Sequence, residues 1–113
     1  MAITSAALTA LVTLPGCGPV YSTSLIMDAN VQLEAARAAD ANKYAPYEYT
    51  LADAYLHKAR EEQGYADYDV CIRLAKKALD AARIAKEKSI TRVREQGVTS
   101  PTAGEPGTAS HQP

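Results

Sequence analysis

The sequence contains no Trp and no Phe, and it has only two Cys and two His among 113 residues. Its aromatic side chains are seven tyrosines, all between Tyr21 and Tyr68, so the core is expected to be thin. Two Cys and two His are too few for a self-contained zinc site or a disulfide scaffold. The formal net charge of -1 argues against a protein that coats nucleic acid. The length fits at most one small domain and excludes a multidomain enzyme.

No long hydrophobic run is present, but the amino terminus is uncharged through residue 16. Its apolar run, AALTALVTL at residues 6–14, is shorter than the roughly 20 residues needed to cross a bilayer. The run fits the hydrophobic region of a signal peptide. We therefore expect residues 1–16 to be a signal peptide. The alternatives are an apolar N-terminal helix that is kept in the mature chain and a cleavable secretory signal without lipid.

A candidate lipidation site follows directly. Leu14-Pro15-Gly16-Cys17 resembles the bacterial lipobox, with an aliphatic residue three positions before a cysteine and small residues between. The resemblance implies that Cys17 becomes the first mature residue and that its thiol is alkylated with diacylglycerol. Gly18 stands where an aspartate would signal retention in the inner membrane, which implies the outer membrane. We expect residues 17–23 to form a lipidated spacer.

Three amphipathic helices are predicted in the middle of the chain, in a helical domain over residues 24–95. The first covers 24–42, the second runs from Pro46 to residue 63 and stops at Gly64, and the third runs from residue 66 or 67 to 94. The third has a heptad seam of small residues: Tyr68, Cys71, Ala75, Ala78, Ala82, Ala85 and Ser89. The pattern predicts an all-α fold, either a three-helix antiparallel bundle or an αα-hairpin with a preceding packed helix, similar to a tetratricopeptide unit.

The C-terminal residues and the charge of the third predicted helix lead to expectations about order, stability and partners. Residues 96–113 are rich in Gly, Pro, Ser, Thr and Ala and are predicted to be a disordered tail. The third predicted helix is the basic one, which we interpret as a solvated face. Because an alanine-rich core buries little apolar area, self-association or docking on a partner is expected.

The sequence offers no constellation of residues suited to catalysis, since the phosphate-loop, dinucleotide, zinc-protease and CxxC motifs are all absent. His57 is a single residue on a predicted helix, and Cys71 lies on the small-residue seam, so both are interpreted as structural. We predict that the protein is not an enzyme and needs no cofactor or metal. The tyrosines near the predicted turns either belong to the core or line a groove.

Four strings carry a resemblance to a known family: LEAARAA at 33–39, YAP at 44–46, ADAYLHKA at 52–59 and LAKKALDAA at 74–82. They resemble a family of bacterial lipoproteins with an alanine-rich helical domain of unknown function, which is sometimes found ahead of an OmpA-like peptidoglycan-binding domain. No OmpA-like domain follows in this sequence, so peptidoglycan binding does not transfer. Only the lipidated Cys17 carries over as a functional residue.

These observations lead to one hypothesis about function and two alternatives. We expect a lipoprotein held on the periplasmic face of the outer membrane, with a membrane partner through its lipid and no nucleic-acid partner. Its helical domain would serve as a structural or partner-docking module for another envelope protein or for a second copy of the chain. One alternative is a soluble tetratricopeptide-like adaptor or small-ligand-binding helical protein that retains residues 1–16. The other is an enzyme that uses His57 or Cys71.

Overall fold

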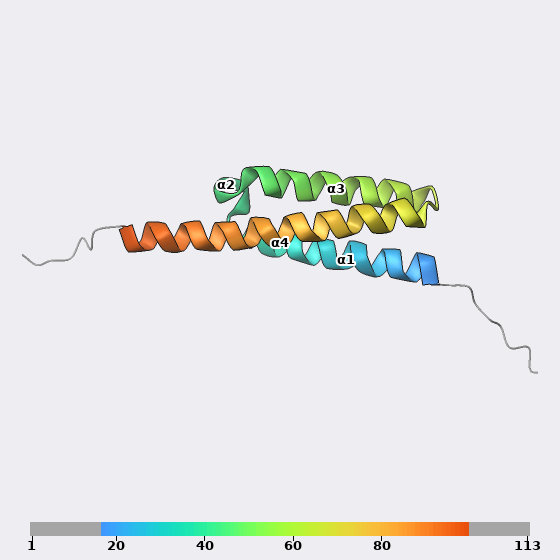
Figure 1. The fold of residues 1–113 in the computed structure, drawn as a ribbon, viewed down its shortest axis with the longest axis horizontal. Coiled ribbons are helices and arrows are strands. Elements are labelled where there is room, and N and C mark those ends of the chain that lie inside the picture. The colour runs from blue at the N-terminus through green and yellow to red at the C-terminus, as the bar shows by residue number, and fades with distance from the viewer. Residues whose placement is uncertain (1–16, 100–113) are drawn as a thin grey trace, which may run out of the picture.

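A computed structural model describes residues 17–99, and these residues contain four helices. Figure 1 shows α4 (Tyr68–Thr99) in the middle, with α3 (Pro46–Gly64) along one side and α1 (Cys17–Ala38) along the other. The short α2 (Ala41–Tyr44) lies between α1 and α3 in sequence. The predicted all-α bundle is confirmed: α3 and α4 form an antiparallel hairpin, and α1 runs alongside α4 in the same direction (Figure 1).

The alanine seam predicted for the last helix forms the centre of the core. Cys71, Ala75, Ala78, Ala82 and Ala85 are all buried. Small side chains let the axes of α1 and α3 approach α4 closely. The volume comes mainly from the two flanking helices, which contribute buried leucine and isoleucine side chains and partly buried tyrosines: Leu25, Ile26, Leu33, Leu56, Tyr49 and Tyr55. Large residues therefore meet small ones across both interfaces.

The first helix begins earlier than predicted. Instead of starting at Ser24, α1 starts at Cys17, so the expected spacer at 17–23 is helical. Ser22 explains the extension, because it is buried and its hydroxyl donates a 3.0 Å hydrogen bond to the carbonyl of Pro19. Pro19 is compatible with this arrangement because a proline in the first turn of a helix interrupts no internal hydrogen bond.

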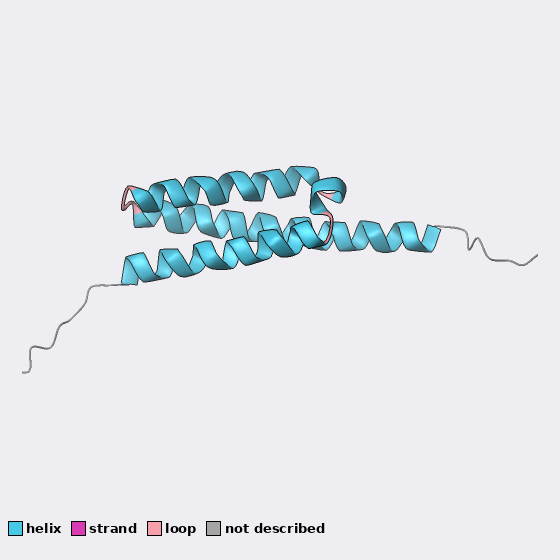
Figure 2. Ribbon diagram, turned by 180° about the vertical axis from the view of Figure 1, so that it is seen from behind, coloured by secondary structure: helices cyan, strands magenta, loops and turns pink. Residues whose placement is uncertain are grey.

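The first helix also ends earlier than predicted. It stops at Ala38 rather than continuing to residue 42, because Asp40 takes a left-handed backbone conformation with φ of 58°. Aspartate tolerates this conformation better than most residues. The chain then makes the single turn of α2, Ala45 follows with φ of -139° and ψ of 56°, and Pro46 opens α3. Figure 2 shows this connection at one end of the bundle and the shorter turn between α3 and α4 at the other end.

The turn between α3 and α4 differs from the prediction in one detail. Gly64 was expected to stop the second helix, and α3 does end there, but Gly64 keeps a negative φ. The left-handed residue is Ala66, with φ of 61°. Asp67 then caps α4, since its side chain accepts a 3.2 Å hydrogen bond from the backbone N–H of Val70.

The last helix is longer than predicted. It continues to Thr99 and so includes the first residues of the expected tail. At about 1.5 Å per residue, its 32 residues span about 48 Å, and its C-terminal end projects past α2 (Figure 1). The rest of the expected tail and the expected signal peptide lie outside the described residues.

Candidate functional site

Cys17, the predicted lipidation site, is the first residue of α1 and is exposed. It therefore lies at the end of the bundle where α1 and α4 both begin, and the C-terminal end of α4 lies at the opposite end (Figure 1). No linker separates Cys17 from the helix. A group attached to this thiol would be held directly on the first turn of α1.

The turn that follows Cys17 is packed against the start of α4. A Cβ atom added to Gly18 would meet the side chain of Tyr68 at 3.6 Å, an ordinary van der Waals distance. One turn further along α1, the buried hydroxyl of Ser22 is a hydrogen-bond partner of the Cys71 thiol. Burial raises the pKa of Cys71, and the hydrogen bond with Ser22 lowers it by less, so the pKa stays above its ordinary value. Cys71 is thus a packed, neutral thiol, in line with the structural role predicted for it.

Both cysteines are free in the described part of the chain. They differ sharply in access, because Cys17 is exposed and Cys71 is fully buried. Modification chemistry can therefore discriminate between them without unfolding the bundle.

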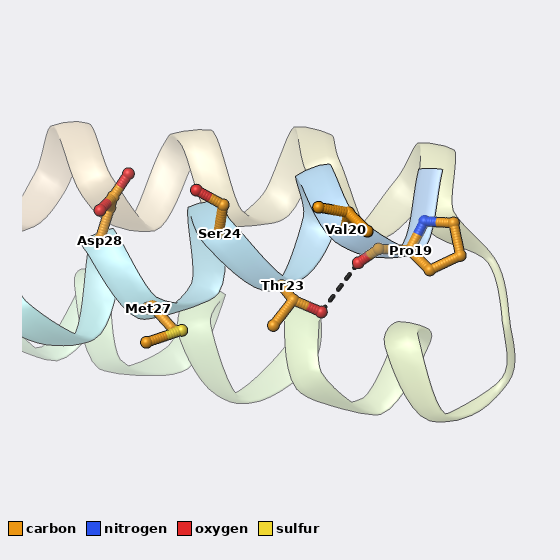
Figure 3. Close-up of a pocket in the computed structure, with 6 residues that line it drawn as sticks. All are labelled: Pro19, Val20, Thr23, Ser24, Met27 and Asp28. Carbon is orange, nitrogen blue, oxygen red and sulfur yellow. Dashed lines mark hydrogen bonds between the residues drawn. The ribbon is translucent and has the colours of Figure 1, made fainter. Parts of the chain in front are cut away.

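The side of α1 that faces away from the core carries large apolar residues. Val20, Met27 and Val31 are 70%, 62% and 62% exposed. Together with Ser24 they follow the helix at spacings of four, three and four residues, which places all four on one face. We call Val20, Ser24, Met27 and Val31 the outer stripe. Figure 3 shows the shallow pocket on this face, lined among the described residues by Pro19, Val20, Thr23, Ser24, Met27 and Asp28.

Side-chain hydrogen bonds join α1 to α3 along the edge where the two helices meet. Arg60 donates to the side-chain oxygen of Asn30 at 2.8 Å, and Gln63 donates to the hydroxyl of Thr23 at 2.8 Å. Arg37 donates to the hydroxyl of Tyr49 at 2.9 Å. On the other edge of α1, the Lys76 ammonium of α4 lies 5.7 Å from the centre of the Tyr21 ring. These contacts fix the rotation of α1 and leave the outer stripe pointing away from the bundle.

A second surface lies between α3 and α4. This α3–α4 groove is lined by aromatic and apolar side chains with charges at its edges: Tyr47, Glu48, Leu51, Tyr55, Lys77, Asp80, Ala81, Ile84 and Lys88. The Lys77 ammonium lies 5.5 Å from the centre of the Tyr55 ring. Lys88 pairs with Glu48 across the groove, and its hydrogen bond lowers the pKa of that carboxyl.

The tyrosines divide between the two possibilities left open by the sequence. Tyr49 and Tyr55 are half-buried and pack against the core. Tyr47 and Tyr65 are each 72% exposed, and of these two Tyr47 lines the groove. The aromatic group therefore serves both as core and as groove lining.

Residues suited to catalysis do not converge within residues 17–99. His57 is exposed on α3, and Cys71 is buried between α1 and α4. No group of three or more His, Cys, Asp or Glu side chains in these residues is arranged to hold a metal ion. Among the same residues, no helix is long and apolar enough to span a bilayer.

The family comparison rests on this helical region. The model of the family described as "Domain of unknown function (DUF4398)" matches residues 24–100, well over half of the chain. The chain belongs to this family. The DUF4398 match includes the last part of α1 and all of α2, α3 and α4. No curated protein and no solved structure is significantly similar to the chain.

The match to DUF4398 begins at Ser24 and so leaves out the first seven residues of α1, including Cys17 and Val20. The α3–α4 groove lies wholly inside the matched region. The outer stripe is divided, with Ser24, Met27 and Val31 inside and Val20 outside. Sequence reasoning missed this stripe, although the spacing of its apolar residues was a readable signal of a second apolar face on α1.

Proposed function

We propose that the protein is an outer-membrane lipoprotein, lipidated at Cys17, whose DUF4398 bundle is a structural or partner-docking module in the cell envelope. The observation that carries this proposal is the exposure of Cys17 at the first turn of α1, directly after a lipobox-like string. Three acyl chains, at about 0.8 kcal/mol per buried methylene, would hold the chain on a membrane essentially permanently.

The docking part of the proposal is supported by the α3–α4 groove. Exposed Tyr47 and Ile84 stand beside the Glu48–Lys88 ion pair, and binding sites commonly combine an apolar centre with a few polar groups of this kind. The groove therefore suits an apolar side chain of a partner protein flanked by charged residues.

Labelling with a palmitate analogue tests the anchor. The wild type should take up the label, and Cys17→Ala should abolish it because the acceptor thiol is gone. Cys71→Ala is the matched control: it also removes a thiol, but a buried one on the alanine seam, and should label like the wild type. An unlabelled wild type would refute the proposal.

The mass of the native amino terminus separates the proposal from a soluble adaptor. Cleavage before Cys17 with an acylated terminus is expected for the lipoprotein. An intact Met1 would favour the adaptor, in which residues 1–16 remain attached.

Sorting to the outer membrane is tested at Gly18. Gly18→Asp should retain the protein in the inner membrane, following the retention signal that the lipobox resemblance implies, and Gly18→Ala should leave sorting unchanged. Both substitutions add a Cβ at an ordinary contact distance from Tyr68, so Gly18→Ala controls for any effect of packing. Equal distribution of the two variants between the membranes would contradict the assignment to the outer membrane.

Two tyrosines of equal exposure test the groove. Tyr47→Glu should reduce co-purification of envelope partners from detergent-solubilised membranes, because it places a charge on the groove lining. Tyr65→Glu alters an equally exposed side chain in the turn between α3 and α4 and should not. Loss of partners in both variants, or in neither, would count against the groove.

A further inference from the structure

The outer stripe is continuous with the proposed lipid attachment point. Cys17 lies three residues before Val20, so it extends the same helical face by almost one turn. From Cys17 to Val31 this face covers 15 residues, and their 14 helical steps extend about 21 Å. None of its five members is charged. The first ionised side chain at the next step of the pattern is Glu34, which is paired with Arg37 at 3.3 Å.

No spacer separates Cys17 from α1, and this determines how close the outer stripe lies to the membrane. Because α1 is helical from Cys17 onward, acyl chains on that residue would leave only the first turn of the helix between the bilayer and the bundle. α1 can then take few orientations relative to the bilayer. Its apolar face begins close to the membrane surface. An exposed apolar face on a helix is stabilised by lying at the boundary between headgroups and acyl chains.

Two of the side chains beside the stripe, Tyr21 and Lys76, suit the same boundary, whereas Asp28, which lines the shallow pocket on the stripe face, is acidic. Tyr21 is 47% exposed, and its ring makes a cation–π contact with the Lys76 ammonium. Tyrosine is enriched where one end of a side chain meets lipid and the other meets water, and lysine extends its ammonium toward the headgroups. Phosphate groups of lipids would balance the charge of Lys76.

The size of the stripe favours a membrane over a second copy of the chain. It has three large apolar side chains, whereas a stable protein interface takes about 20–30 residues from each partner. A membrane contact does not have to supply the whole binding energy, because the acyl chains already keep the protein at the surface. It has only to select one orientation.

We propose that α1 lies lengthwise on the bilayer, with Val20, Met27 and Val31 in contact with lipid and the rest of the bundle above it. This inference rests on the proposed lipidation of Cys17. It places the long axis of the bundle along the membrane. It also leaves the α3–α4 groove free to meet partners, since the core face of α1 lies between the stripe and the other helices.

Spin labelling of the lipidated full-length protein tests the orientation. Nitroxide labels are attached through Met27→Cys or Val31→Cys in a Cys71→Ala background and reconstituted in vesicles of phosphatidylethanolamine and phosphatidylglycerol. His57→Cys, on exposed α3, is the matched control. The measured quantity is the collision rate with oxygen, which concentrates in lipid, divided by that with a water-soluble nickel chelate. We expect this ratio at both stripe positions to exceed the control by at least about threefold, because apolar groups at the membrane boundary are shielded from water.

The outcomes separate this inference from the proposed function. Equal ratios at all three positions in a protein that carries its lipid would overturn the orientation and leave the anchor intact. Low collision rates with both reagents at Met27, together with dipolar broadening between labels, would show a second copy on the stripe and also overturn the inference. A mature protein without lipid would overturn both proposals. Unchanged far-UV circular dichroism of each variant, all at exposed positions, establishes that the bundle is folded.

Discussion

At the turn between α3 and α4, Gly64 lies two positions before Ala66, which holds the left-handed conformation. Replacing Ala66 by glycine and Gly64 by alanine should stabilise the protein. Ala66 has φ of 61°, a conformation in which a Cβ costs about 1–2 kcal/mol. Glycine removes that cost but loses about 0.5–1 kcal/mol more in chain entropy. The Ala66→Gly variant should therefore gain about 0.5–1 kcal/mol in free energy of unfolding.

The reverse change at Gly64 should also stabilise. Gly64 is helical, and a Cβ there would meet nothing within 4 Å. Alanine is favoured over glycine in a helix by up to about 1 kcal/mol, and about half of this is expected at the last helical residue. The two effects should add approximately, although the sites are close enough to interact.

Urea denaturation followed by far-UV circular dichroism measures both changes. Each variant should shift the midpoint upward without changing the slope, because neither alters the surface exposed on unfolding. Ala54→Gly, at an exposed position inside α3, should lower stability by about 1 kcal/mol and serves as the control. A lower midpoint for Ala66→Gly would refute the left-handed assignment and the account of this turn.

Three further predictions concern the core and one ion pair. Leu56→Ala should lower the free energy of unfolding by about 2–5 kcal/mol in urea denaturation, because Leu56 is the largest fully buried side chain; a loss below 1 kcal/mol would mean that the site collapses around the deletion. Ala82→Leu should lower the free energy of unfolding by about 1–3 kcal/mol, because the larger side chain forces the helices apart. Ala54→Leu is the control at an exposed site and should leave the free energy of unfolding unchanged. Equal thermal stability of the two variants would contradict close packing at the seam. Lys88 lowers the pKa of Glu48 below its ordinary 4.5, so the stability advantage of the wild type over Glu48→Gln should be complete above that ordinary value and should vanish as the pH falls through the lower pKa of the folded state. Urea titrations at a series of pH values from about 7 downward check this, and an advantage that does not fall on acidification would refute it.

The sequence predicted the buried positions better than the helix ends. The heptad seam from Cys71 to Ser89 is buried throughout, because a periodic pattern over many turns allows one face to be read clearly. Helix ends depend on single residues. The start of α1 is set by the buried hydroxyl of Ser22 and its bond to Pro19, and neither the burial nor the bond is visible in a local pattern.

The backbone at the turns was predicted less well for a related reason. Gly64 was the natural candidate for a left-handed residue, yet Asp40 and Ala66 hold that conformation. Tertiary packing of α4 against both neighbours determines where each turn falls, and it overrides the local preference for glycine.

Of the candidate site, the sequence indicated Cys17 and left open a groove lined by tyrosines, but it did not indicate the outer stripe. The α3–α4 groove combines residues more than 20 positions apart, such as Tyr47 and Ile84, and only the antiparallel hairpin brings them together. The outer stripe was obscured because the buried face of α1 accounted for most of its apolar residues. The structure separates the two faces, because Leu25 and Ile26 are buried while Val20, Met27 and Val31 are exposed.

The parallel course of α1 and α4 determines how the protein responds to mechanical load. Cys17 begins α1 and Thr99 ends α4, at opposite ends of the bundle (Figure 1), so a pull applied between these two residues slides one helix along the other. Such shearing strains many alanine contacts at once, whereas peeling would separate them one turn at a time. The bundle is therefore oriented to resist tension applied between Cys17 and the end of α4.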